Sequence, residues 1–303
     1  MPSQPAFKTE TGRPAMSEST CTFAARDGTP LFSRRWEPEG PIRGEIFGLH
    51  GLLEHCGRYA DFAACLNAAG YALQMIDHRG HGRSGGSRLF IDRIETLVDD
   101  FDGVLRQWRE RRGRDPDFLF GHSMGAGVLI LHAAAGRSPV RGAILSGPPI
   151  RIAARVLPPL RYVAVLLSFL WPRFRLARLR TAERLGAHAV SRNPEVIQAL
   201  REDPLVFRGR FPVRTAVEIL GLPEKLRQAA AEFDLPYLFL QGGADKLSAA
   251  SGARDFHETS PASDKTLRIY PGLYHEVISE PEKDVVLAEV IRWLGARTAP
   301  QSP

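Results

Sequence analysis

The sequence predicts an α/β fold, with a mostly parallel, doubly wound sheet and a helical cap insertion. Short apolar runs alternate with longer segments of helical spacing, a pattern typical of a parallel sheet covered by helices on both faces. The alternation stops from Gly147 to about Pro212, where helical patterns and prolines occur without a clear strand, and then resumes. One core interrupted by an insertion is therefore the simplest architecture for the 303 residues.

The first half of the chain carries the clearest alternation. The apolar run 46–49 is expected to be a strand, and the helical spacing of 59–69 ends at Gly70, a residue suited to a helix C-cap. The apolar strand 71–76 leads into a loop rich in Gly and Arg, and 94–111 has the spacing of a long amphipathic helix.

The remaining elements are expected on the same grounds, namely apolar runs that end at glycine or polar residues and segments of helical period. The further strands are 117–120, 143–145, 237–241 and 266–270, and the further helices are 124–135, 249–259 and 284–296.

The division of the chain follows from these elements. We expect tails at both ends, the first disordered and rich in Pro, Ser and Thr, with no apolar run of the kind that a signal peptide requires. The expected parts are a tail at 1–20, the first part of the core at 21–147, a helical cap or lid at 148–212, the second part of the core at 213–297, and a tail at 298–303. No stretch is apolar for long enough to cross a bilayer as a helix.

The composition is that of an ordinary globular protein, with 44% hydrophobic and 24% charged residues. The three cysteines, Cys21, Cys56 and Cys65, are odd in number and lack metal-ligand spacing. We interpret them as small buried hydrophobes in a reducing compartment, which makes a cytoplasmic location the expectation, with peripheral membrane contact left open.

The sharpest motif is G-x-S-x-G at Gly121-His122-Ser123-Met124-Gly125, between an expected strand and an expected helix. In this context the serine occupies a tight strand-to-helix turn that lifts its hydroxyl above the carboxyl edge of the sheet. The start of the following helix then points at any oxyanion formed there. The motif therefore predicts Ser123 as a nucleophile.

A serine hydroxyl needs a base, and the base needs an orienting acid. His275 follows the strand 266–270 and Asp245 follows the strand 237–241, so both lie at the same sheet edge as Ser123. Other candidates fail on position, because His188 and His257 fall within helical patterns and Asp234 precedes its strand. Sheet topology thus selects Ser123, Asp245 and His275 as the catalytic residues.

The oxyanion hole should consist of two backbone N–H groups. One belongs to Met124, the residue after the nucleophile, and our candidate for the other is Leu52, in the loop after the first predicted strand. The candidate substrate-binding residues around these groups are His50, Gly51, Arg58 and His122. The side chain of His50 is expected to brace its loop, and Arg58 has an alternative role as a loop anchor paired with Glu54.

Five segments resemble the monoacylglycerol lipase and lysophospholipase branch of the α/β-hydrolases. They are HGLLEHCGRY at 50–59, DHRGHGRS at 77–84, GHSMG at 121–125, SRNPE at 191–195 with DPL at 203–205, and GGAD at 242–245 with YPGLYH at 270–275. The resemblance implies an α/β-hydrolase fold, Ser123 as nucleophile with Asp245 and His275 as its partners, and Leu52 and Met124 as oxyanion donors.

The function expected from these residues is hydrolysis of lipid monoesters, with monoacylglycerol cleaved to fatty acid and glycerol. Lysophospholipids are the rival substrates, acyl transfer is an open alternative to hydrolysis, and a catalytically silent binding module is the alternative of another class. No metal site is expected, because two histidines in the 77–84 loop without a further carboxylate ligand make a poor site. The chemistry needs no cofactor.

The basic charge gathers in the insertion. Eight Arg and one Glu between Arg151 and Val190 give that stretch a net charge of +7, against +6 for the whole chain. Apolar residues recur there at helical spacing through Leu160, Val163 and Leu167. Two interpretations stay open, a cap helix packed on the core with solvated arginines or a lid that meets an anionic membrane. Nucleic acid is not an expected partner, since no aromatic residues interleave a basic face.

Overall fold

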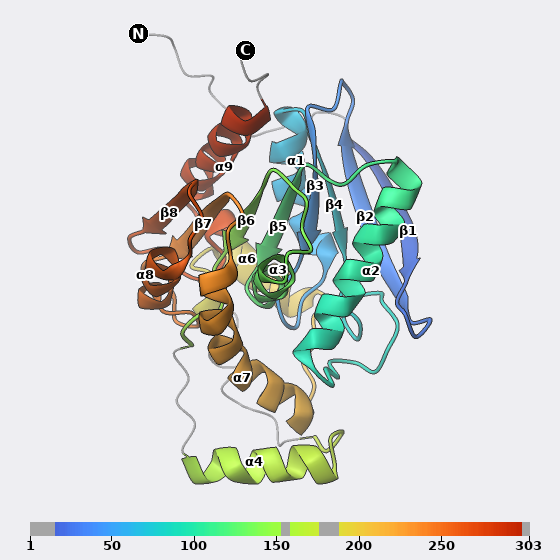
Figure 1. Cartoon of the computed structure of the whole chain (residues 1–303), viewed down its shortest axis with the longest axis vertical. Helices are drawn as coiled ribbons and strands as arrows, with labels where there is room; N and C mark the ends of the chain where they lie inside the picture. The colour runs from blue at the N-terminus through green and yellow to red at the C-terminus, as the bar shows by residue number, and fades with distance from the viewer. Residues whose placement is uncertain (1–15, 153–157, 176–187, 299–303) are drawn as a thin grey trace.

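An eight-stranded sheet runs through the middle of the molecule, with the strands in the order β1-β2-β4-β3-β5-β6-β7-β8 (Figure 1). The computed structural model describes residues 16–152, 158–175 and 188–298 of the chain. The strands are β1 (Met16–Ala24), β2 (Pro30–Pro38), β3 (Gly44–Leu49), β4 (Tyr71–Ile76), β5 (Phe118–His122), β6 (Gly142–Ser146), β7 (Tyr237–Gly242) and β8 (Lys265–Tyr270). β3 to β8 are parallel to one another and β2 is antiparallel to both of its neighbours, which confirms the mostly parallel sheet.

Helices cover both faces of this sheet. They are α1 (Ala60–Ala68), α2 (Ile94–Arg112), α3 (Met124–Ala134), α4 (Pro158–Leu170), α6 (Pro194–Glu202), α7 (Val213–Ala229), α8 (Ala250–Thr259) and α9 (Lys283–Thr298), with short 3-10 helices at Cys56–Tyr59, Ala230–Glu232 and Val277–Ser279. One hydrophobic cluster joins the sheet to α2, α3, α7 and α8, and a second joins its other face to α1 and α9. The doubly wound arrangement is thereby confirmed.

The alternation of side chains along the central strands produces these two clusters. Leu119 of β5 packs on the α2 and α3 side, whereas its neighbours Phe118 and Phe120 pack on the α1 and α9 side. Every residue of β3 to β7 is buried. Apolar residues are therefore required on both faces, which is why these strands were visible in the sequence as continuous apolar runs.

The N-terminal hairpin corrects the expected tail at 1–20. Residues 16–20 belong to β1, which pairs with β2 from Met16 opposite Pro38 to Ala24 opposite Pro30. β1 is an edge strand whose residues 17–20 are all exposed, whereas Phe23 near its other end is buried in the core, so ladder hydrogen bonds and not apolar burial hold its first half in place. Glu18 adds to this by accepting hydrogen bonds from Arg34 (2.6 Å) and from Trp36 Nε1 (3.0 Å). Residues 1–15 lie outside the described part of the chain.

The helical insertion lies between β6 and β7. Of its expected range 148–212, the structure describes α4 and α6 but not 153–157 or 176–187. α6 begins where its local sequence requires, because Asn193 caps the N–H of Glu195 (3.0 Å) and Pro194 opens the first turn. α7 follows directly and buries Leu222 and Leu226 in the cluster that contains α3.

α4 occupies the end of the molecule opposite α9 (Figure 1). It lies across that end beside α7, on the side toward which the carboxyl ends of the parallel strands point. Ligands of open α/β sheets bind outside the carboxyl ends of the strands. This end of the fold is therefore where a functional site is expected. At the other end α9 extends through Thr298, so the expected tail is shorter than 298–303 by that residue.

Candidate active site

Ser123 sits in a strained turn between β5 and α3. Its backbone has φ 51° and ψ −118°, in the left-handed half of conformational space that non-glycine residues rarely adopt. The turn is anchored on the neighbouring strand, because Ser123 N donates to the carbonyl of Ser146 (2.8 Å). The strand, turn and helix expected around G-x-S-x-G are thus all present.

The two glycines of the motif permit close backbone packing. A Cβ at Gly121 would lie 2.5 Å from Cα of Ala126, and a Cβ at Gly125 would lie 2.5 Å from the carbonyl oxygen of His50. The second contact places the start of α3 directly against the loop that contains Leu52. A side chain at either position would push the nucleophile turn away from its neighbours.

Asp245 and His275 meet at the same edge of the sheet. Asp245 follows β7, His275 follows β8, and Asp245 Oδ2 lies 2.7 Å from His275 Nδ1. Backbone N–H groups of Leu247 and Ser248 donate to the other carboxylate oxygen at 2.8 and 2.9 Å. Because both oxygens are engaged, the carboxylate is held in one orientation toward the ring.

The imidazole of His275 lies beside the turn of Ser123. Its ring centre is 4.9 Å from that of His122, the residue before Ser123, and a Cβ built on Gly147 would lie 3.2 Å from its Cε1. The expected hydrogen bond between Ser123 Oγ and His275 Nε2 is not among those formed by the described residues. Such bonds are often long without a bound substrate.

The charges of the pair follow from its burial and geometry. Burial raises the pKa of Asp245, but the positive charge of His275 and the hydrogen bonds to the carboxylate outweigh it and hold that pKa below its ordinary value. Burial lowers the pKa of His275, but the negative charge of Asp245 and their hydrogen bond raise it above its ordinary value overall. For His122, burial and the nearby His275 lower the pKa to about 4, so its ring is neutral near pH 7.

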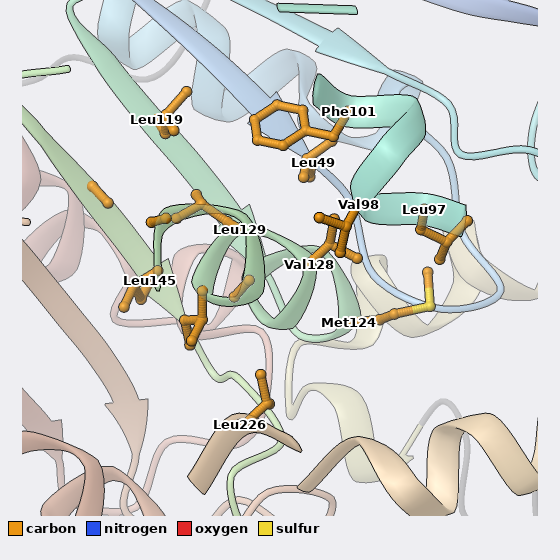
Figure 2. Close-up of a cluster of buried hydrophobic side chains, with 14 of the residues drawn as sticks. Leu49, Leu97, Val98, Phe101, Leu119, Met124, Val128, Leu129, Leu145 and Leu226 are labelled. Atoms are coloured by element: carbon orange, nitrogen blue, oxygen red, sulfur yellow. The ribbon is translucent and has the colours of Figure 1, made fainter. Parts of the chain in front are cut away.

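Two backbone N–H groups near Ser123 are left without a partner. Neither Leu52 N nor Met124 N takes part in the hydrogen bonds recorded among the described residues. The side chain of Met124 does not contribute polarity here, since it points into the hydrophobic cluster toward Leu97 of α2 (Figure 2). The loop with Leu52 is adjacent, because a Cβ on Gly51 would lie 3.2 Å from Cβ of Ser123.

His50 braces this loop from beneath. It is fully buried. Its Nδ1 lies 2.7 Å from the carbonyl oxygen of Gly51, and its Nε2 accepts from the backbone N–H of His78 (3.0 Å). Both ring nitrogens are therefore occupied by backbone groups, which matches the bracing role and leaves the side chain out of reach of a substrate.

Arg58 is engaged by two carboxylates. It donates to Glu54, and it also forms a bidentate pair with Glu276 at 2.7 and 2.8 Å. These contacts correspond to the loop-anchoring alternative. They occupy the guanidinium, which would have to be available if Arg58 bound the substrate. The pairing with Glu276 was not foreseen, since the two residues are 218 positions apart in the chain.

Glu280 is a second buried carboxylate that sequence reasoning missed. It accepts hydrogen bonds from Ser191 Oγ (2.6 Å), from Arg192 and from Tyr274 N (3.0 Å). Because Tyr274 precedes His275, this side chain ties the loop of the candidate base to the segment that returns from the cap. The family resemblance included Ser191 and Arg192, which contact Glu280, but no sequence pattern pointed to Glu280 itself.

The cap also contacts the loop of Leu52 from the other side. Phe207 N donates to the carbonyl of Leu53 (2.9 Å), and His55 Nε2 lies 2.7 Å from Asp203 Oδ2. Leu53 has φ 75°, so this contact holds a second strained non-glycine residue. The segments at 50–59 and 203–205 that carried the family resemblance are therefore partners in space.

Two features are not found in the described part of the chain. No group of three or more His, Cys, Asp and Glu side chains there could hold a metal ion. No helix among those residues has the length and hydropathy needed to cross a membrane.

The fold and the site described above agree with comparisons to known proteins. The family model described as serine aminopeptidase, S33, matches residues 40–282 of this chain. The chain belongs to this family. Membership in the S33 family accounts for the α/β-hydrolase fold seen here, and the S33 family model spans the turn of Ser123, the insertion between β6 and β7, and the loop of His275.

Relatives and solved structures of this S33 family member support the same conclusion. The chain is 36% identical over 278 residues to a monoacylglycerol lipase of Mycolicibacterium smegmatis, covering 92% of this chain and 97% of the relative. It is 34% identical over 276 residues to a monoglyceride lipase of Rattus norvegicus, covering 90% and 89%. The crystal structure of the monoacylglycerol lipase of Paleococcus ferrophilus superposes with a TM-score of 0.75 at 27% identity, covering 93% of this chain and 99% of that one. The chain is a serine ester hydrolase.

Proposed function

We propose that this chain hydrolyses lipid monoesters, with monoacylglycerol as the substrate class, through Ser123, His275 and Asp245. The observation that carries the proposal is the pairing of Asp245 with His275 beside the strained turn of Ser123. The relatives reported above, whose names specify monoacylglycerol or monoglyceride, support the choice of lipid.

The first half of the reaction acylates the enzyme. Ser123 Oγ attacks the ester carbonyl carbon while His275 Nε2 takes its proton, and the oxyanion accepts hydrogen bonds from Leu52 N–H and Met124 N–H. The imidazolium then gives that proton to the leaving glycerol oxygen, which breaks the ester bond. Asp245 keeps the imidazole in the required tautomer and stabilises its charged form.

The second half releases the fatty acid. His275 removes a proton from water, the hydroxide attacks the acyl carbon, and the returning proton restores the hydroxyl of Ser123. All of these steps use side chains and backbone groups of this chain, so no metal or organic cofactor is required. The neutral ring of His122 and the small Gly51 border the reacting carbonyl and would shape the space around it.

A hydrolysis panel tests the substrate class. We expect monoacylglycerols to give a higher kcat/KM than lysophosphatidylcholine or lysophosphatidylglycerol of the same acyl length, with free fatty acid and glycerol as products. Triacylglycerol and peptide substrates should be turned over far more slowly. A higher kcat/KM for either lysophospholipid would reject the choice of monoacylglycerol, and a new ester formed when an alcohol is added would show acyl transfer.

One observation favours the lysophospholipid alternative. Among the described residues, Arg173 donates to Ser87 Oγ (3.0 Å) and lies over the ring of Phe90, Arg175 donates to the carbonyl of Arg210 (3.0 Å), and neither pairs with a carboxylate. Their charges are not balanced by a carboxylate of the described residues and could meet a phosphate. Arg178 and Arg180 lie outside the described residues.

We further propose that α4 docks on a lipid–water interface containing anionic lipids. Its apolar side chains face solvent, with Phe169 80% and Tyr162 77% exposed, and Trp171 continues this surface. Monomeric proteins seldom expose so many large apolar residues together. Arg173 and Arg175 flank this surface, and an amphipathic helix beside basic residues is suited to binding at such an interface.

This docking predicts a specific loss on mutation. Replacing Phe169 and Trp171 together with serine should weaken binding to phosphatidylglycerol-containing vesicles at least about tenfold, because two large apolar side chains no longer enter the interface. Turnover of a short, soluble ester should stay within about twofold of wild type. Vesicle sedimentation measures the first and a chromogenic ester the second.

A matched control is available on α9, where Val285 is 65% exposed at a distance from α4. Val285→Ser should leave vesicle binding unchanged. Equal vesicle binding by the double variant and wild type would contradict docking through α4. Unchanged vesicle binding by the variant with both Arg173→Gln and Arg175→Gln would show that these two arginines are solvated and do not contact anionic lipids.

A further inference from the structure

Glu54 anchors the loop that carries the candidate oxyanion donor. Its Oε1 accepts from Gly51 N (2.6 Å) and from the hydroxyl of Tyr59 (2.9 Å), and its Oε2 accepts from Arg58. The carboxylate is buried, with its residue 5% exposed. Gly51 directly precedes Leu52, so the position of Glu54 determines where the Leu52 N–H can point.

Arg58 extends this anchor across to the loop of His275. Its Nη1 donates to Glu54 and Glu276, and its Nη2 completes the bidentate pair with Glu276 (2.8 Å). Glu276 is 6% exposed, and it directly follows His275. A single guanidinium therefore links the residue before the candidate oxyanion donor to the residue after the candidate base.

The other contacts of the His275 loop run to the cap, to the loop after β7 and within its own segment, and not to the loop of Leu52. Glu276 N donates to the carbonyl of Val190 (2.9 Å), Ala244 N donates to the carbonyl of Leu273 (3.0 Å), and Tyr274 N donates to Glu280. Among the described hydrogen bonds and ion pairs, those of Arg58 are the ones that join the two loops. A bidentate guanidinium–carboxylate pair fixes both distance and orientation, which a single hydrogen bond does not.

We propose that Glu276 is a positioning residue for the acylation of Ser123, which acts through Arg58 and Glu54 to hold the loop of the base at a fixed distance from the loop of the oxyanion donor. The proposal rests on the assignment of Ser123, His275 and Leu52 given above. Reacting groups must be placed closely, since a displacement of about 1 Å can reduce the rate about 10²-fold.

The charges of this network also act on the base. Two carboxylates and one guanidinium leave a net negative charge beside His275, and both Glu276 and Glu54 raise the pKa of that histidine, after the larger effects of burial and Asp245. The neighbouring His122 faces the same ring and is neutral near pH 7. Loss of Glu276 should therefore change both the position and the pKa of His275.

The test is Glu276→Gln, which preserves size and leaves Arg58 paired with Glu54. We expect kcat for monoacylglycerol to fall about 10- to 100-fold with KM within about twofold of wild type. The acid limb of kcat/KM should move to lower pH. Glu276→Asp, which keeps the charge on a shorter side chain, should recover part of kcat.

A matched control separates positioning from stability. Arg35 and Glu45 form another buried ion pair, at 2.8 Å with both side chains 5% exposed, and Glu45 lies in β3 near its start, away from Ser123. Glu45→Gln should lower the Tm by an amount similar to Glu276→Gln and leave kcat unchanged. The inference is overturned if Glu276→Gln keeps kcat within twofold, or if Glu45→Gln lowers kcat equally.

Labelling with a fluorophosphonate distinguishes this inference from the proposed function. The rate of labelling should fall in Glu276→Gln in parallel with kcat, because attack by the nucleophile uses both the base and the oxyanion donors. Wild-type protein that is not labelled at Ser123 would overturn the proposed function itself. Normal labelling of both proteins at equal rates would overturn only the role of Glu276.

Discussion

Replacement of Ser123 by alanine is expected to lower kcat for ester hydrolysis by about 10⁶-fold, since it removes the oxygen that we propose forms the acyl-enzyme. The backbone of the turn should persist, because its anchor to Ser146 uses the main-chain N–H and not the side chain. Initial-rate assays with a chromogenic ester give kcat, and a Tm equal to that of wild type shows that the variant is folded.

Retained activity in Ser123→Ala would contradict this prediction. If folded Ser123→Ala protein retained within about tenfold of wild-type turnover after removal of contaminating esterases, another group would be the nucleophile. Ser168→Ala is a suitable control, because among the described residues the hydroxyl of Ser168 donates to a carbonyl of its own helix α4 (2.7 Å) and to no group near Ser123. Its kcat should match wild type.

Replacement of Asp245 by asparagine is expected to lower kcat by roughly 10⁴-fold. An asparagine amide can donate to Nδ1 of His275. The ring would then carry its proton on Nε2, and Nε2 could not accept the proton of Ser123. The negative charge that raises the pKa of His275 is also lost. Since the base must be neutral, wild-type kcat/KM should rise with pH through a pKa above the ordinary histidine value.

The pH dependence of kcat/KM is a second, independent measurement of the role of Asp245. In Asp245→Asn the acid limb of the residual kcat/KM should move to lower pH, because the histidine loses its proton more easily. Asp264→Asn serves as a control, since Asp264 pairs with Arg297 at the surface (3.0 Å) and precedes β8. A residual activity near that of wild type in Asp245→Asn would show that this carboxylate does not orient the base.

Much of the fold and the three candidate catalytic residues followed from the sequence because they depend on local or topological rules. The turn at Ser123 is set by neighbouring glycines, and Asp245 and His275 were selected because parallel strands bring their carboxyl ends to one edge. β1 was missed, since its exposed first half has no apolar pattern and is held by its pairing with β2.

Two of the supporting carboxylates could not have been predicted in this way. Glu276 and Glu280 are ordinary charged residues in the sequence, and only the folded chain shows them buried beside the site. They have partners that are distant in sequence, as with Arg58 and Glu276. Arg58 illustrates the limit, because both a role in binding substrate and one in anchoring its loop fit the sequence, and its contacts in the fold favour the anchor.

The central claim is that Ser123 carries the acyl group during turnover. Peptide mass spectrometry of protein treated with a fluorophosphonate tests it most directly. We predict one adduct, on the peptide that contains Ser123, which does not form in Ser123→Ala and forms more slowly when monoacylglycerol is present. An adduct on a different residue, or unmodified Ser123 in protein whose esterase activity has been abolished by the probe, would contradict it.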